Sequence, residues 1–82
     1  MLQIASYEIL GRLRKVNAIV ASLDRYASYA GLHPHKDAYQ LAQMLRGWPA
    51  SRWIAVAVGC GVRPPSDETI REIVAVYTRR SA

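Results

Sequence analysis

The sequence predicts an all-α fold, a single domain over residues 1–82 with a long first helix followed by three shorter helices in a compact unit. Three observations support this prediction. Apolar residues recur at helical spacing, the breaks between segments are short and rich in Gly and Pro, and no two segments show the alternation of paired strands. Because 51% of the residues are hydrophobic, a core can form without metal or disulfide.

The first predicted helix runs from about Ser6 to Ala30, and Gly31 follows as its C-terminal stop. Its apolar residues recur at alternating spacings of four and three, which is a heptad pattern: Ile9, Leu13, Val16, Val20, Leu23, Ala27 and Ala30. Two interpretations are open. The stripe packs inside a small helical bundle, or it forms a homodimer or partner interface made of Ile9, Leu13, Val16, Val20, Leu23 and Tyr26.

The second predicted helix begins at Lys36 or Asp37 and ends at Gly47, with Asp37 in its first turn. The third spans Pro49 to Gly59, with Ser51 as a source of a capping oxygen. Residues 53–58 are apolar on all sides, so periodicity alone does not separate a buried helix from a buried strand. The lack of a partner strand favours the helix.

The fourth predicted helix follows the sequence Arg63-Pro64-Pro65. Ser66 is suited to the N-cap, Asp67 and Glu68 to the positive first turn, and Arg79 and Arg80 to the last turn. One face carries apolar residues at i, i+3, i+4 and i+7, which predicts that this face is buried: Ile70, Ile73, Val74 and Tyr77.

The charge balance supports nucleic-acid binding, although it also occurs in ordinary basic domains. The chain has 11 basic and 6 acidic residues, a net charge of +5, and nine of the basic residues are arginine. Arginine binds phosphate and guanine in a bidentate manner, although a GC-rich genome gives the same composition. Cys60 is the single cysteine, and neither a signal peptide nor a run of about 20 apolar residues is visible. We therefore expect a cytoplasmic protein that does not cross a membrane.

The segment from Ser51 to Arg80 resembles helix-turn-helix DNA-binding domains. It has a small residue, Ala57, then Gly61 four positions later, and aliphatic Val62 and Ile70 that can seal two helices together. The run GVRPPSDETIREI is similar to the start of recognition helices in GntR-like repressors. The resemblance implies a helix-turn-helix-like hairpin in which Ser66, Thr69 and Arg71 face the DNA and Arg63 lies at the turn.

Metal binding and catalysis have little support in the sequence. His33 and His35 form a His-x-His pair, to which Asp37 adds at most a third ligand of unspecific spacing. Cys60 lies between two glycines and is more typical of a small apolar residue in a turn than of a nucleophile. We expect no metal, no cofactor and no enzymatic activity.

Two functions are consistent with these features. The first is a small DNA-binding transcriptional regulator of helix-turn-helix type, of the kind carried by phages and mobile elements, in which Arg12 and Lys15 add contacts to the DNA backbone. The alternative is a helical protein-interaction module, such as a phage-encoded, anti-CRISPR-like inhibitor of a host defence complex. The heptad stripe, the Tyr and Trp content and the acidic start of the fourth helix favour this alternative.

Overall fold

The computed structural model describes the backbone of residues 2–82 and the side chains of residues 10–82. Over this range the chain forms four helices and no strand: α1 (Leu2–Tyr29), α2 (Ala38–Arg46), α3 (Ala50–Cys60) and α4 (Asp67–Arg80). The predicted all-α fold with a long first helix is confirmed. Residues 53–58 are helical throughout, so the choice between helix and strand is decided in favour of the helix.

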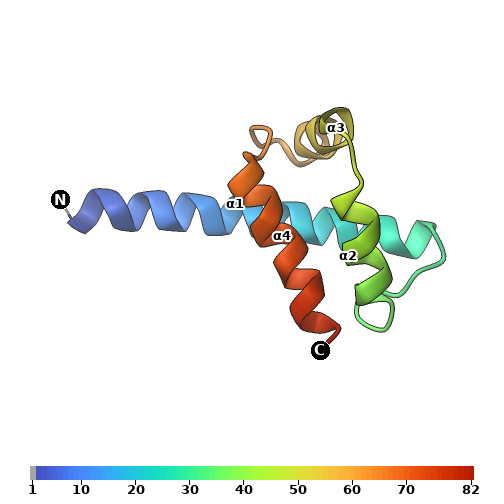
Figure 1. The fold of residues 1–82 in the computed structure, drawn as a ribbon. Coiled ribbons are helices and arrows are strands. Elements are labelled where there is room, and N and C mark those ends of the chain that lie inside the picture. The colour runs from blue at the N-terminus through green and yellow to red at the C-terminus, as the bar shows by residue number, and fades with distance from the viewer. Residues whose placement is uncertain (1) are drawn as a thin grey trace.

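The long helix α1 runs along the whole molecule (Figure 1). Its 28 residues, at about 1.5 Å each, span about 42 Å, close to the largest dimension of 44 Å. The helix begins at Leu2, earlier than the predicted Ser6, and its N-terminal part extends beyond the other helices (Figure 1). None of the described helices is both long and apolar enough to span a bilayer.

Glycines with positive φ end α1 and α3. Gly31 has a φ of 78° and Gly61 a φ of 70°, both in the left-handed region that favours glycine. At each site the glycine N–H and the next N–H bond back to carbonyls of the last helical turn, Leu32 to Ala27 at 2.8 Å and Val62 to Ala57 at 3.0 Å. This Schellman arrangement satisfies carbonyls that the helix itself leaves unpaired. The prediction that Gly31 stops the first helix is confirmed, while α3 ends at Cys60, one residue beyond the predicted Gly59.

The N-termini of α2 and α3 differ from the prediction. Asp37 occupies the N-cap of α2 rather than its first turn, and its carboxylate accepts a hydrogen bond from the His33 N–H at 2.7 Å. Pro49 is the N-cap of α3. The prediction that Ser51 caps this helix is wrong, because Ser51 already lies inside the first turn. Neither helix has a side-chain cap, so both depend on tertiary packing more than α4 does.

The helix α4 begins as predicted. Ser66 has an extended backbone, and its hydroxyl accepts a hydrogen bond from the Thr69 N–H at 3.2 Å. Asp67 and Glu68 lie in the first turn, where the helix dipole favours negative charge. The helix ends at Arg80, whose position in the last turn suits the opposite end of the dipole.

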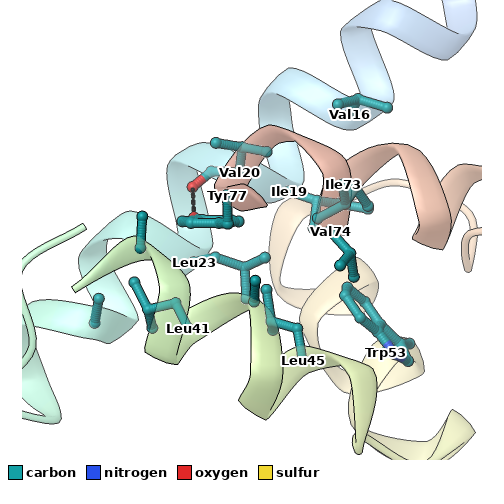
Figure 2. Packing of buried hydrophobic residues seen from close by; sticks show 13 residues of the cluster. Val16, Ile19, Val20, Leu23, Leu41, Leu45, Trp53, Ile73, Val74 and Tyr77 are labelled. Atoms are coloured by element: carbon teal, nitrogen blue, oxygen red, sulfur yellow. Dashed lines mark hydrogen bonds between the residues drawn. The ribbon is translucent and has the colours of Figure 1, made fainter. Parts of the chain in front are cut away.

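The core lies where the C-terminal half of α1 meets the three shorter helices. α4 packs mainly against α2 and also against α1, while α3 packs against α1 (Figure 1). Figure 2 shows Leu23 of α1 pointing toward Leu45 of α2, with Ile73 and Tyr77 of α4 above them. Ile73, Val74 and Tyr77 from the predicted apolar face are buried, and Ile70 is partly buried. All four helices therefore share one core.

Candidate functional site

A groove with a volume of about 620 Å³ opens between α2, α3 and α4. This volume lies within the range of about 300–1,000 Å³ that is typical of ligand-binding pockets. Its walls come from the end of α2, the α2–α3 connection, the first turn of α3 and one face of α4: Leu45, Arg46, Trp48, Ala50, Trp53, Asp67, Ile70, Arg71, Val74, Ala75, Thr78 and Arg79.

One face of α4 forms a complete wall of the groove. Its lining residues lie at i, i+3, i+4, i+7, i+8, i+11 and i+12, from Asp67 at the start of the helix to Arg79 near its end, which is the repeat of one helix face. The neighbouring face carries Ile73 and Tyr77 into the core, and Val74 lies at the border between the two faces. The helix is thus fixed on its core side while its groove side stays open.

Two tryptophans form the floor of the groove. The rings of Trp48 and Trp53 lie edge to face with centroids 5.1 Å apart, and Tyr26 packs edge to face on Trp48 at 5.9 Å. Trp53 is only 3% exposed and lies beside Val74 and Leu45 (Figure 2). The buried Nε1 of Trp48 has no hydrogen-bond partner among the described side chains, which costs about 1–3 kcal/mol. Apolar packing, rather than hydrogen bonding, therefore holds Trp48 in place.

The rim of the groove is mainly positive. Arg46 reaches from α2 toward α4 and donates a hydrogen bond to the Thr78 hydroxyl at 3.3 Å. Arg71 and Arg79 are exposed on α4, and no described acidic side chain pairs with them. Outside the lining, the Arg52 guanidinium lies 5.8 Å from the centre of the Trp48 ring. Asp67 is the single acidic residue of the lining.

The residues predicted to face DNA fall into two groups. Arg63 and Arg71 are exposed, as a contact with DNA requires. Thr69 is only 5% exposed, and its hydroxyl lies 3.1 Å from that of Ser66, which also caps α4. The Thr69 side chain is therefore not presented to a partner at the surface. Sequence reasoning identified the cap but not the burial, which depends on how α4 packs against its neighbours.

Arg12 and Lys15 were predicted to touch the DNA backbone. The guanidinium of Arg12 lies 3.1 Å from the Glu72 carboxylate and 3.4 Å from that of Glu68. These contacts join α1 to the first turns of α4, across 56 and 60 positions of sequence. Arg12 thus has partners within the chain, and it compensates part of the acidic start of α4. Lys15 is partly exposed.

The heptad stripe of α1 divides at Val16. Val16, Val20 and Leu23 are buried in the core of the chain itself, so in this fold they serve the first interpretation, packing within a helical bundle. Leu13 is 49% exposed and Tyr26 is 40% exposed. The side chain of Ile9 lies outside the described residues. Among the described residues of the predicted dimer or partner interface, Leu13 and Tyr26 face solvent while Val16, Val20 and Leu23 do not.

A partly buried polar cluster joins α1 to the end of α4. The Tyr77 hydroxyl donates its proton to the Asp24 carboxylate at 2.6 Å and lies 3.3 Å from the Val20 carbonyl. Arg80 donates to Asp24 at 2.9 Å and to the Pro34 carbonyl at 3.3 Å. Burial alone would raise the pKa of Asp24, but the bonds from Arg80 and Tyr77 hold it below its ordinary value. Burial and the Asp24 carboxylate raise the pKa of Tyr77.

The histidine pair and the cysteine take local structural roles. The Nδ1 atom of His33 accepts hydrogen bonds from the N–H groups of His35 and Lys36, both at 3.1 Å. Together with Asp37, it fixes the turn before α2. The Cys60 thiol lies 3.6 Å from the Ala18 carbonyl, where α3 meets α1. Among the described residues, no group of three His, Cys, Asp or Glu side chains is placed to hold a metal ion.

No protein-family model, curated protein or solved structure matches the chain. The function proposed for it therefore rests on its own geometry.

Proposed function

We propose that this chain is a protein-interaction module that holds a segment of a larger protein in the groove between α2, α3 and α4. The observation that carries the proposal is the groove itself, about 620 Å³ with a floor of two tryptophans and a rim that includes Arg46, Arg71 and Arg79. Arg and the partly exposed Trp48 are of the residue types that contribute most binding energy at protein interfaces, while the buried Trp53 supports Trp48 from within the core. Preformed apolar floors with polar rims are typical of such interfaces.

Binding fits the residue types of the groove better than catalysis does. Arginine stays protonated at every physiological pH, so the arginines of the lining cannot accept a proton from a substrate. Asp67 is the single carboxylate of the lining, and it lies at one end. A small helical protein that covers a site on a larger protein acts as an inhibitor or an adaptor. A phage-encoded inhibitor of a host defence complex belongs to this class.

A pair of variants with the same chemical change tests the proposal. Ala75 lies in the α4 wall of the groove, and Ala21 is exposed on α1. Ala75→Arg and Ala21→Arg each add one charge and a long side chain to a helix that tolerates arginine. Proteins captured from host cells are identified by mass spectrometry, and binding is then measured with the purified partner. The proposal predicts at least tenfold weaker binding by Ala75→Arg alone, and equal binding by both variants would refute it.

DNA binding is the second proposal, and exposed arginines support it. Arg63 and Arg71 are exposed without an acidic partner among the described side chains, and the net charge is +5. Such a surface would bind duplex DNA through phosphates, with an affinity that falls steeply as salt rises. A gel shift with random duplex at low salt measures this. No retardation at micromolar protein would end the proposal, and retardation lost in Arg63→Ala with Arg71→Ala would support it.

A further inference from the structure

We propose that the groove is occupied by an amphipathic helix of the partner that presents acidic residues to the arginine rim. This inference rests on the function proposed above and adds the chemistry of the partner. It follows from three properties of the groove: its length, the distribution of charge along its wall, and the burial of its aromatic floor. Amphipathic helices commonly bind by laying an apolar face into such a groove.

The length of the groove suits a helix of three to four turns. The α4 wall extends from Asp67 to Arg79, which is about 18 Å along the helix axis at 1.5 Å per residue. Ile70, Val74 and Ala75 occupy its middle and offer apolar contacts at helical spacing. Side chains at i, i+3, i+4 and i+7 of a bound helix would meet these positions. The apolar face of the bound helix would thereby reach the tryptophan floor.

The mainly positive charge of the groove favours a bound helix that carries acidic residues. Going along α4, the lining begins with Asp67, continues with Arg71 one turn later and ends with Arg79. Arg46 joins this positive region from α2 through its bond to Thr78. Carboxylates of a bound helix are attracted to the part of the groove between Arg71 and Arg79, and they are repelled at the Asp67 end. The groove therefore favours a partner helix with its acidic residues toward one end.

A second copy of this chain is a poor occupant. The N-terminal part of α1 extends beyond the other helices, so it is the candidate occupant from a second copy (Figure 1). In sequence it carries Arg12, Arg14 and Lys15 against a single acidic residue, Glu8. Its charge has the same sign as the rim. Glu68 and Glu72 of α4 form ion pairs with Arg12 of the same chain.

Nucleic acid also fits the groove poorly. A single-stranded nucleic acid would need exposed aromatic faces on which its bases could stack. Trp53 is 3% exposed, and Trp48 is partly buried in T-shaped contacts with Trp53 and Tyr26, with the Arg52 guanidinium over its ring. The rings thus form a packed apolar floor rather than a stacking surface. An apolar side chain of a protein helix is the better match for this floor.

Two matched peptide libraries test the inference. Both display 16-residue helices with random apolar residues at i, i+3, i+4 and i+7; one carries Asp and Glu beside this face, the other Lys and Arg at the same positions. Each is selected on the wild-type protein and counter-selected on Ala75→Arg. The affinity of each recovered peptide is then measured for two double variants of the protein, Arg71→Glu/Arg79→Glu and Arg25→Glu/Arg63→Glu. The second double variant has the same net charge but changes no residue of the lining.

The acidic library is expected to yield peptides that bind wild type and the Arg25/Arg63 variant equally. Because each exposed ion pair lost weakens binding about two- to fivefold, the Arg71/Arg79 variant is expected to bind about tenfold more weakly. The basic library should instead enrich on the Arg71/Arg79 variant. Circular dichroism of each variant verifies that the helices are retained.

The possible failures are distinct. If peptides sensitive to Ala75→Arg come equally from both libraries, or from the basic one, the groove binds peptides but the acidic-helix inference is overturned. If neither library yields a peptide whose binding is weakened by Ala75→Arg, the proposed protein-binding function is refuted as well. If random duplex DNA displaces the acidic peptides and loses its own binding in the Arg71/Arg79 variant, the rim is a phosphate site, and the inference is overturned in favour of nucleic acid.

Discussion

Replacing Tyr77 with phenylalanine removes a single oxygen atom from the interior of this protein. The ring of Tyr77 is fully buried, and its hydroxyl lies 2.6 Å from the Asp24 carboxylate. The substitution leaves the packing of the ring unchanged, including the Arg80 guanidinium 4.9 Å from its centre. The Val20 carbonyl, 3.3 Å from the hydroxyl, belongs to α1 and keeps its place in the helix. The change in stability therefore reports mainly on the bond to Asp24.

The expected loss follows from the environment of Asp24. A hydrogen bond to a charged group contributes about 1.5–3 kcal/mol to stability. Arg80 still pairs with Asp24 after the substitution, and the Asp24 side chain is 29% exposed, so water replaces part of the lost bond. We therefore expect the low end of that range, about 1.5 kcal/mol. For a domain of this size such a loss lowers Tm by roughly 10 °C.

The same substitution has a specific pH dependence. The pKa of Asp24 in the folded state is lower than its ordinary value of 3.8. A carboxylate of this kind stabilises the fold above its unfolded pKa, and the stabilisation is lost as the pH falls through the folded pKa. Without the Tyr77 hydroxyl the pKa of Asp24 moves back toward its ordinary value. The difference between wild type and Tyr77→Phe is therefore largest above about pH 5 and becomes smaller below about pH 4.

Urea denaturation at pH 7, 5 and 3 measures this difference. Tyr29→Phe serves as the control, because Tyr29 is 92% exposed and its substitution should leave the free energy of unfolding unchanged. A Tyr77→Phe variant as stable as wild type at pH 7 would show that the bond to Asp24 contributes nothing. An equal loss at all three pH values would show that the loss does not arise from the Asp24 carboxylate.

Four further substitutions test other parts of the fold by thermal or urea denaturation. Gly61→Ala should cost about 1–2 kcal/mol because Gly61 has a φ of 70°, whereas Gly59→Ala, inside α3 with open space around it, should stabilise the protein by up to about 1 kcal/mol; equal effects would contradict the end assigned to α3. Ser66→Ala should cost about 1 kcal/mol through loss of the cap on the Thr69 N–H, and an unchanged midpoint would argue against that cap. Trp48→Phe removes a buried unpaired donor together with part of a ring, so the two effects should cancel to within about 1 kcal/mol; a loss above about 3 kcal/mol would mean that the indole N–H has a partner.

Local sequence signals predicted the helices and most of their ends. Gly31, Gly61 and Ser66 each have a backbone role that few other residue types can take, so their positions could be read without knowledge of the tertiary structure. The apolar face of α4 was equally visible, because its spacing matches the helical repeat. Ser51 failed as a predicted cap since the preceding proline starts the helix instead.

The groove and its charges could not be predicted in the same way. Its lining combines α2, α3 and α4, and the relative placement of helices depends on how all of their side chains pack together. The pairing of Arg12 with Glu72 and of Arg80 with Asp24 joins residues 56 or more positions apart. No local pattern distinguishes these arginines from exposed ones such as Arg71. The burial of Thr69, which removes one predicted DNA contact, has the same origin.

Photocrosslinking in cells tests most directly whether the groove meets a protein partner. A benzophenone amino acid replaces Ala50, which is exposed at the start of α3 and lines the groove, or Ala21, which is exposed on α1 outside it. After irradiation, a groove that binds a protein helix should give one discrete crosslinked protein from Ala50, with the bond mapped to an acidic helical segment, and none from Ala21. The absence of a crosslink from Ala50, or the same products from both positions, would contradict the proposed role of the groove.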